Sequence, residues 1–322
     1  MTPADLSLTV LHAVRRAVDE GALRVDVPRD VKVERPRPGG VGDYASSVAL
    51  SLARPSGRAP LDVAGILKER LRGSPGIRAV DITGPGFLNF TLDVGQGARL
   101  VREVGEAGLE YGYSDALAGS VVRFGDVGED RARLVGESVV RLLRSQGADA
   151  AIGSLGQERI HVLPAPYAPD VFGPDAARWA LLRAAPHDHA LPGGPLLVQH
   201  ERNGLFRVRY AHSRAQGLMR NGAQLGIQAG YEVEDGAQQL LTALADHPAV
   251  LLAAARHRSP DRLARHLEVV ADALLSFQHT VLPLGDEKPS AAHRSRLALA
   301  EAAGTVLAGG LSLLGISAPD QI

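Results

Sequence analysis

Cysteine is absent from this chain of 322 residues, and lysine occurs only at positions 32, 68 and 288. The lack of cysteine excludes disulfide scaffolds, thiolate metal sites and cysteine nucleophiles. Lys+Arg totals 35 and Asp+Glu totals 36, so the net charge is -1. This balance excludes a uniformly basic nucleic-acid coat but permits a local basic patch.

Long hydrophobic runs are also lacking. We find no apolar run near the roughly 20 residues that a membrane helix needs, and the first five residues lack the cationic start of a signal peptide. We therefore expect a cytoplasmic globular protein with no membrane partner. At 322 residues, 45% of them hydrophobic, the chain should form two or three domains.

Three segments differ in their patterning. Residues 1–112 combine helical spacing with two alternating strands at 77–83 and 87–93, which predicts helices on one face of a small sheet. Residues 113–195 suffice for about two βα units, too few for a complete nucleotide-binding fold. Residues 196–322 show helical spacing almost throughout, which predicts a bundle. Specific expectations are a helix at 44–54 capped by Asp43, strands at 120–124 and 160–163, and helices at 60–72, 131–145, 174–183, 203–224, 236–246, 248–256, 260–281 and 291–314.

Several short motifs point to no chemistry. Residues 39–42 are glycine-rich, but no Gly-Lys-Ser/Thr follows, so a plain turn is expected. His187 and His189 alternate in a Pro/Gly-rich loop without a third ligand, and His161 lies in an apolar segment where a core or edge histidine is expected. No Gly-x-Ser-x-Gly elbow is present. We expect no catalytic residue, no metal and no cofactor.

A basic segment at residues 199–220 holds five arginines against one glutamate. On a helix, Arg207 and Arg214 share one face, while Arg209, His212 and Arg220 share the adjacent face. Such a stripe suits phosphate contacts, and Tyr210 could stack on a base. The alternative is a solvated helix face.

Stretches at both ends resemble arginyl-tRNA synthetases. Residues 33–36 (Val-Glu-Arg-Pro), 42–45 (Gly-Asp-Tyr-Ala) and 84–90 (Gly-Pro-Gly-Phe-Leu-Asn-Phe) resemble the N-terminal domain, which contacts the D-loop at the tRNA elbow. Other stretches resemble the helical anticodon-binding domain and the helix that leads out of the catalytic domain. The stretches that resemble the anticodon-binding domain are 208–214 (Val-Arg-Tyr-Ala-His-Ser-Arg), 262–265 (Arg-Leu-Ala-Arg) and 313–319 (Leu-Leu-Gly-Ile-Ser-Ala-Pro). The stretch that resembles the helix out of the catalytic domain is 173–179 (Gly-Pro-Asp-Ala-Ala-Arg-Trp).

The resemblance implies tRNA contacts at both ends. Asn89 could hydrogen-bond a base edge beside a stacking ring; alternatively, Phe87 or Phe90 fills the core and Asn89 is merely exposed. Alternation places Phe87 and Asn89 on one face and Phe90 on the other. Ile322 stands where the family commonly ends in methionine, and residues 276–279 replace an aromatic-rich stretch of the family, so we expect weaker base selectivity at this end than the resemblance alone implies. The implied contacts are Tyr44, Asn89 and Phe90, then Arg207, Arg209, Tyr210, His212, Arg214, Arg220, Phe277, His279 and Ile322.

The middle of the chain departs from that family. Its His-x-Gly-His signature corresponds here to Asp126-Val127-Gly128-Glu129, followed by Asp130. Carboxylates suit a helix N-terminus but repel phosphate. The Lys-Met-Ser-Lys-Ser signature is missing because no lysine lies between positions 68 and 288. These departures predict a truncated paralogue without synthetase activity.

The sequence thus predicts a multidomain α+β protein. Its parts are a small α/β tRNA-elbow-binding-like domain (1–112), a reduced Rossmann-like remnant (113–195) and an all-α anticodon-binding-type bundle (196–322). The expected function is tRNA binding, with arginine tRNA as the candidate, as an accessory or regulatory factor in translation, and no DNA partner is expected. Two alternatives stay open: a module that docks a synthetase or another translation protein without RNA, and a residual enzyme that uses aminoacyl-tRNA.

Overall fold

A computed structural model describes residues 3–34, 36, 41–92, 95–126, 128–154, 156–231 and 237–322. It divides into two compact units, Met1–Leu100 and Val101–Ile322, with the boundary inside helix α4 (Gln96–Ala107). The predicted segments 113–195 and 196–322 pack together in the second unit. Arg35, Gly39, Gly40 and Val127, which belong to motifs considered above, lie outside the described residues.

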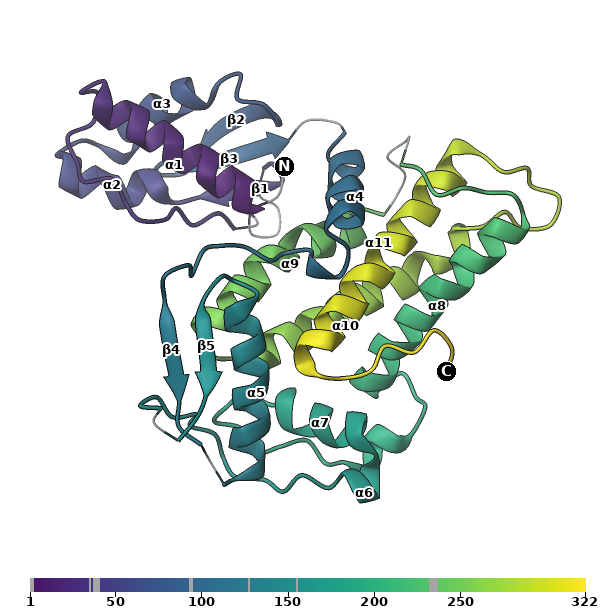
Figure 1. Cartoon of the computed structure of the whole chain (residues 1–322). Coiled ribbons are helices and arrows are strands. Elements are labelled where there is room, and N and C mark those ends of the chain that lie inside the picture. The colour runs from purple at the N-terminus through teal and green to yellow at the C-terminus, as the bar shows by residue number, and fades with distance from the viewer. Residues whose placement is uncertain are drawn as a thin grey trace. The chain divides into compact units, whose positions relative to one another are not determined.

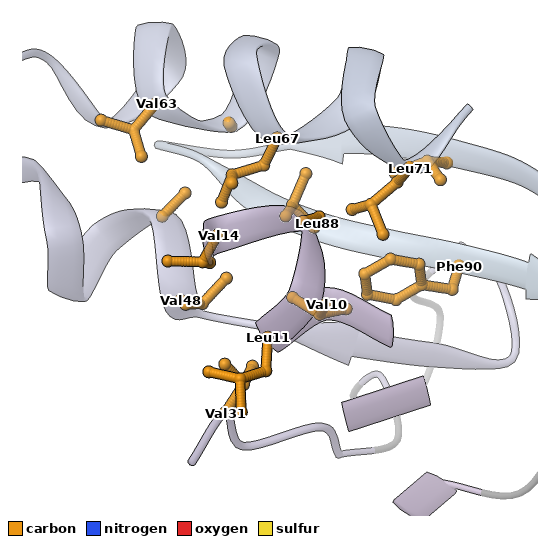
Figure 2. Packing of buried hydrophobic residues seen from close by; sticks show 14 of the residues in the cluster. Val10, Leu11, Val14, Val31, Val48, Val63, Leu67, Leu71, Leu88 and Phe90 are labelled. Carbon is orange, nitrogen blue, oxygen red and sulfur yellow. The ribbon is translucent and has the colours of Figure 1, made fainter. Parts of the chain in front are cut away.

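The N-terminal unit is built on a three-stranded antiparallel sheet of order β1-β3-β2 (Figure 1). The predicted hairpin is confirmed, and its turn has positive φ at Gly84 and Gly86, which favours glycine. Leu88 and Phe90 of β3 are fully buried and lie among Val10 and Leu67 of the helices (Figure 2). The elements are β1 (Tyr44–Ser46), β2 (Ile77–Thr83), β3 (Phe87–Leu92), α1 (Pro3–Asp19), α2 (Val48–Ser56) and α3 (Pro60–Leu71).

The expected helix at 44–54 with Asp43 as its cap is wrong at its start. Strand β1 occupies the first three residues, pairing Ala45 with Asn89 of β3, and α2 begins only at Val48. The Asp43 carboxylate accepts a hydrogen bond from the Leu92 N–H at 2.9 Å. Asp43 therefore fastens β1 to β3, and the sheet edge overrides the helical pattern.

The second unit begins with a single βαβ crossover: β4 (Val121–Phe124), α5 (Asp130–Arg144) and β5 (Asp149–Ile152). The strands are parallel, from Val121↔Asp149 to Phe124↔Ile152. Strand β5 was not predicted, because Asp-Ala-Ala-Ile lacks the β-branched alternation typical of strands. The strand expected at 160–163 does not form, and His161 is exposed, so the expectation of a core or edge histidine is wrong.

Helices α8 to α11 form the predicted C-terminal bundle (Figure 1). The two helices expected at 236–246 and 248–256 are one continuous helix, α9, with Pro248 inside it. The helix expected at 260–281 is α10 (Pro260–Phe277), which continues as the 3₁₀ turn η3 (Gln278–Thr280), so it ends slightly earlier than expected. The remaining elements are η1 (Gly108–Glu110), α6 (Pro169–Phe172), α7 (Pro174–Leu182), η2 (Gly194–Leu197), α8 (Gly204–Gln224), α9 (Gln238–Arg256), α10 (Pro260–Phe277), η3 (Gln278–Thr280) and α11 (Ala291–Leu314).

Helix α11 corrects the expectation about long apolar runs. By length and composition it could cross a membrane, yet 78% of its most apolar window is buried inside the structure. Its glycines allow close packing: a Cβ on Gly309 would lie 2.6 Å from the Leu109 carbonyl oxygen, and one on Gly310 would lie 2.5 Å from Leu267 Cδ2. The run is apolar because α11 is a core helix of this unit.

Candidate nucleic-acid interface

The sheet of the N-terminal unit has one face toward the helices and one open face. Phe90 is fully buried and Tyr44 is 7% exposed, and both belong to the core. Base stacking on the Phe90 ring is therefore incompatible with the fold, which corrects the contact expected there, while a tRNA contact at Tyr44 stays a prediction. Phe87, on the opposite face, is 39% exposed. Strand alternation predicts that Phe87 and Phe90 lie on opposite faces of the sheet, but it does not predict which of the two faces the helices cover.

Asn89 shares the open face with Phe87 but is 4% exposed. Its Nδ2 donates to Thr83 Oγ1 at 2.7 Å and to the Phe87 carbonyl at 3.4 Å. Its strand neighbours are Ala45 and Asp81. The amide thus ties β3 to the end of β2 and fixes the surface around Phe87, while base recognition by Asn89 stays a prediction.

The arginine stripe lies on α8, and three of its members contact other elements of the unit. Arg207 Nε lies 3.2 Å from Asp272 Oδ1 of α10, and Arg209 Nη1 lies 3.5 Å from Asp175 Oδ2 of α7. Arg214 Nε donates to Gln278 Oε1 of η3 at 2.6 Å. These contacts fasten α8 to its neighbours, yet each uses only part of the five donors of a guanidinium. Packing and phosphate contact are therefore both open to these side chains.

His212 is 3% exposed, so it adds no charge to an accessible stripe. Its Nδ1 lies 3.1 Å from the Gly304 carbonyl oxygen, and its Nε2 lies 3.6 Å from Asp320 Oδ1. A direct RNA contact at His212 is incompatible with this burial. Tyr210 is 37% exposed and stacks on Phe206, with ring centroids 5.5 Å apart. Tyr210 is thus the accessible ring of α8.

The C-terminal residues lie along α8. The Asp320 carbonyl accepts from Ser213 Oγ at 3.2 Å and from Arg220 Nη2 at 3.4 Å. Ile322 lines a cleft of about 270 Å³ together with Phe206 and Arg209. Arg220 and His279 are exposed and Phe277 is half-buried. The residues expected to contact tRNA in this domain thus lie at the Ile322 cleft, at η3 beside Arg214 and at the exposed Arg220, and their contacts to tRNA stay a prediction.

The segment 126–129, which corresponds to the His-x-Gly-His signature of the family, ends at the N-terminus of α5 and caps it through Glu129. Glu129 is the N-cap, and its carboxylate accepts from the N–H groups of Arg131 at 3.1 Å, Ala132 at 2.6 Å and Ala165 at 2.9 Å. Asp130 accepts from the Tyr167 N–H at 3.0 Å. That backbone hydrogen bond, helped by Arg133, lowers the pKa of Asp130. The donors that suit a phosphate at a helix N-terminus are thus used by the chain's own carboxylates. Asp126 and Gly128 are exposed.

Arg131 is a residue that sequence reasoning missed. It is fully buried, and all its donors reach backbone carbonyl oxygens at the end of α7 and in nearby loops. Burial lowers its pKa, while Glu129, Asp188 and Asp261 oppose that effect. Arg131 therefore holds the crossover to the following chain. The five acceptors are Leu163 (2.9 Å), Leu181 (3.1 Å), Ala184 (3.2 Å), Ala185 (2.9 Å) and Asp188 (2.7 Å).

Metal ligation finds no support in the described part of the chain, which holds no group of three or more His, Asp or Glu arranged around a common point. The His187 side chain is 85% exposed, and its Nε2 lies 3.8 Å from Asp188 Oδ1. The loop around His187 is therefore a solvated one.

Two domain families match this sequence. The arginyl tRNA synthetase N terminal domain matches residues 8–92, and the DALR anticodon binding domain matches residues 208–322. Together with the single βαβ crossover between them, these domains define a protein of aminoacyl-tRNA synthetase architecture.

Similar proteins specify the architecture further. The arginine–tRNA ligase of Micrococcus luteus is 46% identical over 164 residues, which cover 46% of this chain and 30% of that protein. The ligase of Pseudarthrobacter chlorophenolicus is 24% identical over an alignment of 555 positions that covers both chains fully, although this chain has 322 residues. The solved arginyl-tRNA synthetases of Thermus thermophilus and Plasmodium falciparum share the fold, with TM-scores of 0.73 and 0.69, identities of 13% and 7%, and coverage of 100% and 99% of both chains. The chain therefore carries two domains of the arginyl-tRNA synthetase type, the N-terminal domain and the anticodon-binding domain, and it is shorter than the ligase of Pseudarthrobacter chlorophenolicus with which it aligns from end to end.

Proposed function

We propose that this chain binds tRNA, with arginine tRNA as the candidate, and acts without aminoacylation as an accessory or regulatory factor of translation in the cytoplasm. The observation that carries the proposal is that both ends of the chain match domains of arginyl-tRNA synthetases, whereas the segment between them is much reduced. Both terminal domains of the family are present, whereas the described part of residues 93–207 between them holds a single βαβ crossover, β4-α5-β5.

The closed helix N-terminus supports the non-catalytic part of the proposal. In a synthetase reaction, ATP brings its triphosphate to donors that stabilise developing charge. Here the Glu129 carboxylate accepts from the N–H groups of Arg131 and Ala132 at the start of α5, and Asp130 accepts from the Tyr167 N–H. The negative charge of both carboxylates opposes a polyphosphate at this helix N-terminus.

A docking module is the second candidate function. It is favoured by the internal partners of Arg207, Arg209 and Arg214, because guanidinium groups that hold a domain together are less available to phosphate. In that case the two domains would serve as surfaces for a synthetase or another translation protein.

Two assays on the full chain separate these functions. Filter binding to total tRNA across a salt series should give an affinity that falls as salt rises, because phosphate contacts release counterions. Arginine-dependent ATP–pyrophosphate exchange should be undetectable. Absence of tRNA binding would favour the docking module. Exchange that disappears on changing Asp126 or Glu129 would favour the residual enzyme instead.

A further inference from the structure

A basic hollow lies in the N-terminal unit where the end of α3 meets β2. It has a volume of about 260 Å³ and is lined by residues of both elements and of the turn between them. Its cations are Lys68, Arg72 and Arg78, and Asp81 is the acid among its lining residues. Lys68 is one of only three lysines in the chain. The hollow therefore concentrates positive charge in a protein whose net charge is -1.

A β-bulge places Arg78 at this hollow. Ile77 pairs with Leu92 and Ala79 with Thr91, so Arg78 is the extra residue of β2. A bulge of this kind leaves its extra residue outside the ladder and redirects the side chain. Arg78 is exposed, and β2 is an edge strand of the three-stranded sheet.

The cations of the hollow differ from the neighbouring structural arginine. Arg70 is 20% exposed and bound to Glu20 and to the Ile66 carbonyl, so it serves the packing of this unit. The Arg72 side chain, in contrast, is 76% exposed, and its Nη1 lies 3.6 Å from Oε2 of Glu69, whose side chain is 65% exposed. An ion pair of that kind contributes little to stability, which leaves Arg72 available to a ligand.

The position of the hollow relates it to the open face of the sheet. Asp81, which lines the hollow, is the direct cross-strand partner of Asn89, and Phe87 is two residues from Asn89 on the same face. Contacts to phosphates fix the position of a nucleic acid, while contacts to bases select its sequence. One sheet thus presents a cationic edge beside a face with an exposed ring.

We infer that the basic hollow, through Lys68, Arg72 and Arg78, binds backbone phosphates of a tRNA; the inference rests on the proposed tRNA-binding function. The competing occupant is an acidic protein segment that adds a strand to β2. The bulge at Arg78 argues against that occupant, because bulges interrupt the regular edge that strand addition requires.

The test compares two triple variants of the full chain. The hollow variant is Lys68→Gln/Arg72→Gln/Arg78→Gln, and the matched control is Arg15→Gln/Arg54→Gln/Arg58→Gln, which removes three exposed cations of the same unit outside the hollow. All six side chains are exposed or half-buried, so circular dichroism should show unchanged folding in both variants. Binding to several tRNAs is then measured between 50 and 300 mM KCl.

The hollow variant should bind every tRNA at least about tenfold more weakly at 100 mM KCl, and the slope of log affinity against log salt should flatten by about one for each lost phosphate contact. The control should change affinity by less than about threefold, because salt screens charges that lie farther than about 10 Å from the bound phosphates. Equal slopes for the wild type and the hollow variant would overturn this inference alone. Failure of the wild type to bind any tRNA would overturn the proposed function and this inference with it.

Discussion

Tyr111 donates a hydrogen bond from its hydroxyl to the backbone carbonyl of Leu244 at 3.3 Å. Leu244 lies four residues before Pro248 in α9, and proline has no N–H to donate back to that carbonyl. The Tyr111 ring also stacks on His247, with centroids 6.0 Å apart. A residue far away in the sequence thus supplies the partner that the helix lacks, and α9 continues through its proline.

Tyr111→Phe should lower the free energy of unfolding by about 1–2 kcal/mol, because it leaves a buried carbonyl without this donor. In a Pro248→Ala background the loss should be smaller, since residue 248 then has an N–H for the Leu244 carbonyl. Urea unfolding of the four proteins in this double-mutant cycle measures the difference. An identical loss in both backgrounds would show that the hydroxyl serves another acceptor.

The buried histidines of α9 and α10 predict acid sensitivity. His247 and His266 have ring centroids 5.3 Å apart. Burial lowers the pKa of His247 well below its usual value, and His266 adds to that effect. Burial also lowers the pKa of His266 to about 4. Both rings are therefore neutral in the folded protein at neutral pH.

The sign of the effect follows from which state takes up protons. Below pH about 6.5 the unfolded chain protonates both histidines and the folded chain does not, so stability falls as pH decreases, at up to about 1.4 kcal/mol per pH unit for each group. For His266 the fall ends near its folded pKa of about 4. Urea unfolding of the wild type and His266→Gln between pH 7.5 and 5 tests this, and the variant should show about half the slope. Equal slopes would contradict the assignment to His266.

The Arg131→Met variant should destabilise the second unit by about 3–5 kcal/mol, because five backbone carbonyls lose their donor and three of them, those of Leu181, Ala184 and Ala185, are buried. Arg133→Gln is the matched control on the same helix, since Arg133 is 41% exposed and its ion pairs with Asp130 and Glu137 are solvated. The control should change stability by less than about 1 kcal/mol. Thermal or urea unfolding followed by circular dichroism distinguishes the two. A loss no larger in Arg131→Met than in the control would rule out this role.

Hydrophobic periodicity correctly predicted the helices and strands that are determined by their own local sequence. The β2–β3 hairpin, α3 and α11 have alternation or helical spacing bounded by glycine or proline, and they occur within about a residue of the expected ends. Strand β5 and strand β1 depend on partners elsewhere, β4 and β3, that local patterning does not reveal. Asp43 illustrates this limit. A carboxylate that precedes an apolar segment can cap a helix, but it can equally well accept a hydrogen bond from a distant N–H, as Asp43 does from Leu92.

The candidate sites were predictable to a similar extent. Composition alone revealed the arginines of α8, but their partners Asp175 and Asp272 come from other helices. A buried arginine such as Arg131 has no sequence signal, because its acceptors are backbone groups common to every residue. The packing of the helices determines which face of β3 is exposed. It therefore also determines that Phe87, and not Phe90, is the accessible ring.

The α8 arginines should contribute to tRNA affinity without base selectivity. Changing Arg207 and Arg214 together to Ala should weaken all tRNAs alike and flatten the salt slope, but it also removes contacts to Asp272 and Gln278 that hold the helix. Arg220→Gln is the cleaner variant, because Arg220 is exposed and its Nη2 donates to the Asp320 carbonyl oxygen at a distance of 3.4 Å, a contact outside the helix packing. It should reduce the salt slope by about one with stability unchanged. Unchanged affinity and slope in both variants, with folding intact, would make the stripe a solvated face and favour the docking module.

The open face of the N-terminal sheet should supply the selective part of binding. Phe87→Ala should cost about 1–3 kcal/mol of tRNA binding if its ring stacks on an unstacked base. Because Phe87 is 39% exposed, the change should leave stability nearly intact. Leu61→Ala is the matched control, since Leu61 is 54% exposed in the same unit and should not alter affinity.

Asn89→Ala should cost about 1–2 kcal/mol of binding, the range for a lost hydrogen bond that strands a desolvated partner. This loss should occur only with tRNAs that carry the recognised D-loop base, whereas loss of phosphate contacts affects every tRNA. Filter binding with one tRNA and its D-loop base variants separates the two effects. The Asn89 amide also binds Thr83 Oγ1, so Thr83→Val tests whether disturbing that contact alone changes binding. If Thr83→Val reproduces the Asn89→Ala result on every tRNA, then Asn89 shapes the surface and the base is selected elsewhere.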